Sequence, residues 1–62
     1  DNYEVIKHKK FEMRPMEVDE AILQMNMLGH NFFMFLNAST GKVNVVYKRR
    51  EGNYAVLEPE YN

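Results

Sequence analysis

The sequence contains no cysteine, which removes two common ways of stabilising a small protein. Neither a disulfide framework nor a thiolate metal site can form without this residue. A secreted domain of 62 residues would normally need such crosslinks, because a chain of this size buries little apolar surface. We therefore expect an intracellular domain that gains part of its stability from self-association.

The chain also lacks a long apolar run and a strong excess of either charge. The longest apolar run, Phe32–Leu36, has the length of a strand and is far shorter than the roughly 18 residues of a membrane-spanning helix. Eight basic and nine acidic residues give a net charge of -1, which argues against nucleic-acid binding driven by bulk charge. The apolar and charged fractions are ordinary, so we expect one folded domain rather than a disordered chain.

The predicted order of elements is β-α-β-β-β. A loose alternation of apolar residues predicts a first strand over residues 3–13, which Pro15 should end. Apolar residues at helical spacing predict a helix over residues 17–28, which Gly29 should close. Three more strands are predicted over residues 31–37, 43–50 and 53–58. This pattern is typical of an α+β fold in which one helix packs on a small, mostly antiparallel four-stranded sheet.

The turn lengths predict which side chains share a face of the sheet, because loop length sets hairpin register. A four-residue loop at 38–41 pairs Phe32 with Tyr47. A two-residue loop at 51–52 pairs Tyr47 with Val56. Both faces are then apolar, and we expect the helix to cover the less bulky one. The residues predicted to lie under the helix are Phe33, Phe35, Asn44, Val46, Ala55 and Leu57.

The second face would be exposed in a monomer, because one helix covers only one face of such a sheet. An apolar patch of this extent is larger than a typical monomer carries. A second copy is the simplest cover, since a two-fold interface needs only one self-complementary patch. The predicted homodimer interface consists of Phe32, Met34, Leu36, Val43, Val45, Tyr47, Tyr54 and Val56.

Several short motifs follow one another along the chain. They are Lys10-Phe11-Glu12-Met13-Arg14-Pro15-Met16, Glu20-Ala21-Ile22-Leu23-Gln24-Met25, Leu28-Gly29-His30-Asn31-Phe32-Phe33-Met34-Phe35, Asn44-Val45-Val46-Tyr47 and Gly52-Asn53-Tyr54. Over about residues 5–59 the chain closely resembles the C-terminal domain of the long-form ribosome hibernation promoting factor family, also described as the sigma-54 modulation or ribosomal subunit interface protein family. Glu17, Met34 and Ala55 depart from the usual Asp, Val and Gly, but no apolar position of the predicted interface is lost.

The resemblance implies a homodimerisation module that is not an enzyme and needs no cofactor. In that family an N-terminal domain binds the small ribosomal subunit and blocks the decoding region, and a flexible linker leads to the C-terminal domain. Two C-terminal domains pair and tether two 70S ribosomes into an inactive 100S dimer, which down-regulates translation under stress. The family is bacterial, with plastid relatives, which implies a cytoplasmic protein. Because the chain begins with Asp1, we expect residues 1–62 to be the C-terminal domain of a longer protein.

A monomeric RNA-binding sheet is the alternative function. Phe32, Tyr47 and Tyr54 would then stack on bases, and ribosomal RNA phosphates would be contacted by a basic cluster. That cluster is Lys48, Arg49 and Arg50. The aliphatic residues of the same face favour protein packing over base stacking.

Other residue types point to no further chemistry. A second basic cluster, Lys7, Lys9 and Lys10, reads either as a solvated strand edge or as a phosphate contact. His8 and His30 are the only histidines, and they lack the spacing of a metal site. The sequence contains no nucleophile-base arrangement and no phosphate-binding loop, so we do not expect an enzyme.

Overall fold

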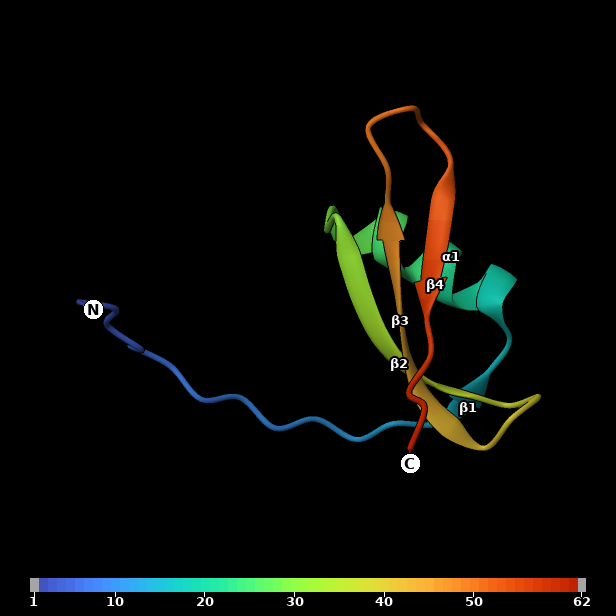
Figure 1. The fold of residues 1–62 in the computed structure, drawn as a ribbon, viewed down its shortest axis with the longest axis horizontal. Coiled ribbons are helices and arrows are strands. Elements are labelled where there is room, and N and C mark those ends of the chain that lie inside the picture. The colour runs from blue at the N-terminus through green and yellow to red at the C-terminus, as the bar shows by residue number, and fades with distance from the viewer. Residues whose placement is uncertain (1, 62) are drawn as a thin grey trace.

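A computed structural model describes residues 2–61 and places one helix on a four-stranded sheet within them (Figure 1). The elements are β1 (Pro15–Met16), α1 (Val18–Leu28), β2 (Phe32–Asn37), β3 (Lys42–Lys48) and β4 (Tyr54–Leu57). The strands lie in chain order; β1 runs parallel to β2, and the other two pairs are antiparallel. The β-α-β-β-β order and the α+β class predicted from the sequence are confirmed, with a mixed sheet.

The helix begins and ends close to the predicted residues. Glu17 is the N-cap, but its side chain makes no capping hydrogen bond. Its carboxylate instead accepts a hydrogen bond of 2.8 Å from the Ser39 hydroxyl, which ties the β2–β3 loop to the start of α1. At the other end Gly29 is left-handed, with φ 73°, and its N–H donates to the Asn26 carbonyl. This arrangement is the usual closure of a helix by glycine.

The core is small and lies between α1 and the middle of the sheet. Ala21 and Met25 of the helix pack on Phe35 of β2 and Val46 of β3, and all four side chains are fully buried. Partly buried side chains surround them: Met16, Val18, Ile22 and Phe33. The prediction that the helix covers the face of β2 and β3 carrying Phe35 and Val46 is confirmed.

A buried amide pair lies beside this core. Asn37 Nδ2 donates to Asn44 Oδ1 over 2.7 Å, and both residues are buried. The Asn44 Nδ2 group has no partner among the described residues. Buried polar groups normally find partners, so the Asn44 Nδ2 group is an exception within this small core.

The first hairpin has the predicted register. Phe32 pairs with Tyr47 and Leu36 with Val43, across a four-residue loop. The loop closes because Gly41 is left-handed, with φ 73°, and donates its N–H to the Asn37 carbonyl over 2.7 Å. The Asn37 side chain also accepts the Ser39 N–H over 2.9 Å, an Asx turn.

The register predicted for the second hairpin is wrong by one residue. Arg49 donates its N–H to the Asn53 carbonyl over 2.8 Å, which leaves three residues, 50–52, in the loop instead of two. A two-residue type I′ turn would need positive φ at both of its central residues. Only Gly52 adopts it there, with φ 91°, whereas Glu51 does not. A left-handed glycine at the third position is typical of three-residue hairpin loops.

The shifted register exchanges the two faces of β4. Tyr47 pairs with Ala55, and Val46 pairs with Val56. Tyr54 and Val56 therefore lie on the helix-bearing face, where the Tyr54 hydroxyl accepts a hydrogen bond of 3.2 Å from Asn26 Nδ2 of α1. Ala55 and Leu57, predicted to lie under the helix, lie on the opposite face.

The first predicted strand is also wrong in position. Residues 3–13 form no strand in the structure; residues 2–14, hereafter the N-terminal arm, run as an unpaired segment away from the body (Figure 1, blue). The ladder with β2 is limited to Pro15 opposite Leu36 and Met16 opposite Asn37. Pro15 therefore starts this short strand instead of ending a longer one, because its missing N–H is tolerated on an edge strand.

Candidate protein-binding face

The sheet surface turned away from α1 is apolar and is covered by no helix in the described part of the chain. Alternation along each strand and the observed pairings define its members. We call this surface the open face: Phe32, Met34, Leu36, Val43, Val45, Tyr47, Ala55 and Leu57. Phe32 is 64% exposed and Leu57 is 56% exposed, and none of the eight side chains is charged. A contiguous surface of this kind marks an interaction site in soluble proteins.

The open face contains six of the eight residues predicted for the dimer interface. Tyr54 and Val56 do not belong to it, because the longer β3–β4 loop turns them toward α1. Sequence reasoning missed Ala55 and Leu57 for the same reason. The relevant signal is Gly52, whose place as the third loop residue, not the second, sets the register of β4.

An apolar hollow of about 520 Å³ opens where the N-terminal arm passes the open face. Phe32, Met34 and Val45 of the open face form its floor, and Lys9 and Phe11 of the arm line it as well. His30 and Phe33 complete the lining. This space, hereafter the face hollow, joins the arm and the open face into one apolar surface.

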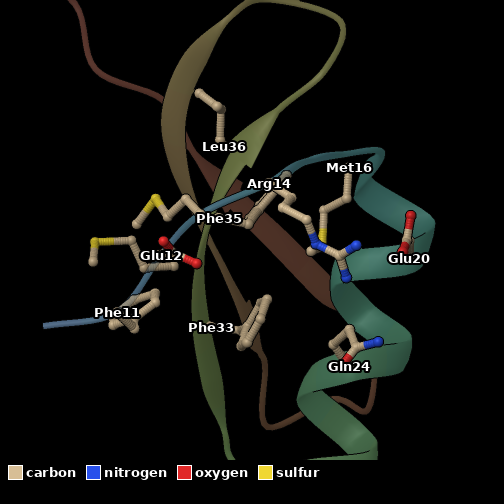
Figure 2. A pocket seen from close by; sticks show the side chains of 11 residues that line it. Phe11, Glu12, Arg14, Met16, Glu20, Gln24, Phe33, Phe35 and Leu36 are labelled. Atoms are coloured by element: carbon tan, nitrogen blue, oxygen red, sulfur yellow. The ribbon is translucent and has the colours of Figure 1, made fainter.

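A second, smaller hollow of about 180 Å³ lies along the free edge of β2. Arm residues 11–14 line it together with β2 and with Glu20 and Gln24 of α1. In Figure 2, Phe11 and Glu12 lie on the side of β2 away from the helix, whereas Arg14 lies on the helix side. The arm therefore passes β2 at a distance from its ladder and continues toward the open-face side. We call this space the edge hollow.

The predicted RNA contact lies at one end of the sheet. Lys48, Arg49 and Arg50 end β3 and begin the loop to β4, and all three are exposed. Arg49 Nη2 lies 3.7 Å from Glu51 Oε1, an exposed pair that contributes little stability. Because β2 separates β1 from β3, adjacent strands do not bring this cluster together with the lysines of residues 7–10.

The aromatic platform of the RNA-binding alternative is not assembled. Phe32 and Tyr47 are paired on the open face, but Tyr54 lies on the other side of the sheet. Within residues 2–61, no group of three or more His, Cys, Asp or Glu side chains is placed to hold a metal ion. No helix in the described part of the chain has the length and apolar character needed to cross a membrane.

Comparison with known proteins gives a consistent set of relatives. The family model described as "Sigma 54 modulation/S30EA ribosomal protein C terminus" matches residues 1–56. The ribosome hibernation promotion factor of Bacillus subtilis (strain 168) is 52% identical over 59 residues, which cover 95% of this chain and 31% of that protein. The factor of the same name from Staphylococcus aureus (strain COL) is 44% identical over 55 residues, 89% of this chain and 29% of that protein. The chain thus spans less than a third of either relative.

Proposed function

Because the chain belongs to the Sigma 54 modulation/S30EA ribosomal protein C terminus family, we propose that it is the homodimerisation module of a ribosome hibernation factor. Its partners are a second copy of itself and, through the rest of the protein, the ribosome. The site of action is the bacterial cytoplasm, because the two named relatives are bacterial ribosome hibernation promotion factors. No bond is made or broken in this function.

The observation that carries the proposal is the open face. It consists of eight uncharged side chains on three adjacent strands, and four of them are exposed in the single chain: Phe32, Met34, Val43 and Leu57. Two such faces can pack at the usual sheet-to-sheet distance of about 10 Å, with their side chains interdigitating. A two-fold axis makes one patch sufficient, since each copy presents the same residues to the other.

The dimer would act as a tether. In the proposed mechanism another part of each protein holds a ribosome, and pairing of the C-terminal modules joins two 70S ribosomes into an inactive 100S particle. Linkage of this kind works through effective concentration, because each bound anchor raises the local concentration of the other module. Translation is then reduced by sequestration of the ribosomes.

Contact of Lys48, Arg49 and Arg50 with ribosomal RNA phosphates remains a separate proposal. These exposed cations lie beyond the open face, so phosphate contact and dimerisation need not compete. A monomeric RNA-binding sheet has less support, because Tyr54 does not share a face with Phe32 and Tyr47.

Sedimentation equilibrium across a thousandfold range of concentration tests the proposal. We expect a mass of twice 7.4 kDa that persists into the low micromolar range. A folded monomer at all concentrations would overturn dimerisation, and RNA binding with a steep salt dependence would then favour the alternative.

A matched pair of variants tests the face. Phe32→Asp should yield a folded monomer, because it places a charge within the proposed apolar interface. Leu23→Asp is the control, since Leu23 is 56% exposed on α1 and lies outside the open face. A dimeric Phe32→Asp variant together with a monomeric Leu23→Asp variant would show that the wrong surface has been chosen.

A further inference from the structure

We propose that the N-terminal arm crosses to a second copy and adds to that copy's sheet as a strand. The dimer would then be held by exchange of arms as well as by contact of open faces. This inference rests on the proposed function, because it names the segment with which each copy holds its partner.

The arm carries large apolar side chains that have no cover in the single chain. Tyr3 is 91% exposed, Val5 72% and Ile6 77%. Tyr3, Val5 and Phe11 share one parity, so they lie on one side of an extended strand. A solvated linker is typically polar and poor in aromatic and β-branched residues. The composition of the arm therefore indicates a segment that is buried in the assembled protein.

The arm does not pair with the sheet of its own chain. Continuation of the β1–β2 register would place Arg14 opposite Phe35 and Phe11 opposite Phe32, but the ladder stops at Pro15. The edge hollow separates the arm from β2 at this point (Figure 2). The outer edge of β4 also has no partner among the described residues. Each copy thus presents unpaired backbone edges together with one unpaired arm, and exposed edges of this kind readily pair with another chain.

The arm leaves the body next to the surface where the second copy is proposed to bind. Lys9 and Phe11 share the face hollow with Phe32, Met34 and Val45 of the open face. Residues 2–13, at about 3.3 Å each, reach about 40 Å, whereas packed sheets lie only about 10 Å apart. An arm that starts at the open face can therefore cross the interface and run along a strand of the second sheet.

Symmetry favours a second copy over an unrelated peptide as the acceptor. An unrelated strand would cover one edge but would leave the arm of this chain exposed. In a two-fold pair each arm is covered by the other copy, and exchange of identical elements is a low-cost route to a dimer. The lysines at 7, 9 and 10 act against open-ended stacking of further copies, because charged side chains on an edge discourage additional pairing.

Nuclear magnetic resonance on mixed dimers tests the exchange directly. Equal amounts of isotope-labelled and unlabelled 62-residue chain are unfolded, mixed and refolded, and an isotope-filtered experiment then detects only contacts between copies. We expect such contacts from the Val5 and Ile6 methyl groups to sheet residues, and slowed amide exchange across residues 3–13. A dimer whose arm amides are unprotected, or whose arm contacts only its own chain, would overturn the exchange but leave the proposed function intact. A monomer at millimolar concentration would overturn both.

Two sets of arm variants supply an independent readout. The apolar set is Tyr3→Ser, Val5→Ser and Phe11→Ser in one chain, and the control set is Glu4→Ser, His8→Ser and Lys10→Ser. All six side chains are exposed in the single chain, so helix content by circular dichroism should not change. We expect the apolar set to raise the dimer dissociation constant at least about thirtyfold, and the control set to change it less than about threefold. Equal effects of the two sets would overturn the inference.

Discussion

The two faces of the sheet are built from the same three strands, and both are apolar, yet only one is covered. Under α1 lie Phe35 and Val46, which are fully buried, and the Asn37–Asn44 amide pair. On the open face Phe32 and Leu57 remain more than half exposed to solvent. The difference arises because β2 carries apolar residues at every position from Phe32 to Leu36, whereas the chain supplies one helix of 11 residues. The covered face holds the buried core of the single chain, and the open face keeps large apolar side chains exposed.

The largest expected effect comes from a truncation on the covered face. Phe35→Ala removes the largest fully buried side chain, and loss of a buried Phe costs about 3–5 kcal/mol. A domain of this size has a total stability of roughly 3–9 kcal/mol, at about 0.05–0.15 kcal/mol per residue, so most of it would be lost. Urea unfolding followed by circular dichroism, with wild type and variant at the same protein concentration, measures this loss.

Leu23→Ala is the control for this truncation. Leu23 is exposed on α1, and substitution of such a side chain typically changes stability by less than about 0.5 kcal/mol. If Leu23→Ala and Phe35→Ala lowered the free energy of unfolding equally, the covered face would not be the core of the single chain.

A second pair of variants compares the two faces at neighbouring residues of β4. Leu57→Ser removes an apolar side chain from the open face, and we expect it to raise the dimer dissociation constant about tenfold or more. Val56→Ser acts on the helix-bearing face, where Val56 is 37% exposed, and should lower the free energy of unfolding by about 1 kcal/mol with little change in dimer affinity. Sedimentation and urea unfolding separate the two readouts. The reverse result would indicate that β4 has the register of a two-residue loop at 51–52, as predicted from the sequence.

The smallest expected effect on dimerisation comes from the β3–β4 loop, which belongs to neither face. Arg49→Glu together with Arg50→Glu should change the dimer dissociation constant less than about threefold, because exposed charges outside an interface core contribute little. Filter binding to ribosomal RNA at two salt concentrations measures the other possible role. Conversion of this variant to a monomer would place the loop inside the interface.

The first hairpin shows what local sequence can predict. Asn37 and Gly41 bound a loop whose length is set by an Asx turn and a left-handed glycine, so the pairing of Phe32 with Tyr47 follows from the turn. The helix was predictable for a similar reason, because its apolar spacing and its closing glycine agree.

The second hairpin and the arm show where local sequence is insufficient. Glu51-Gly52 fits both a two-residue turn and the end of a three-residue loop, and the choice depends on whether Arg50 pairs. Because of that ambiguity, the sequence prediction assigned four residues of β4 to the wrong faces: Tyr54, Ala55, Val56 and Leu57. For residues 3–13 the alternation favours a strand that the structure does not form, because a strand also needs an available edge, and the pattern of a segment does not name its partner.

The Asn37–Asn44 hydrogen bond has a consequence for the opposite side of the sheet. Asn44 lies opposite Phe35, two residues along β2 from Asn37, and in the observed register the two amides meet under α1. A slip of β3 by one residue would turn Asn44 outward and leave the buried Asn37 amide without its acceptor, which is costly for a buried donor. The bond thus favours one alignment of β2 and β3, and a polar contact on the helix-bearing side of the sheet determines which apolar side chains lie on the open face.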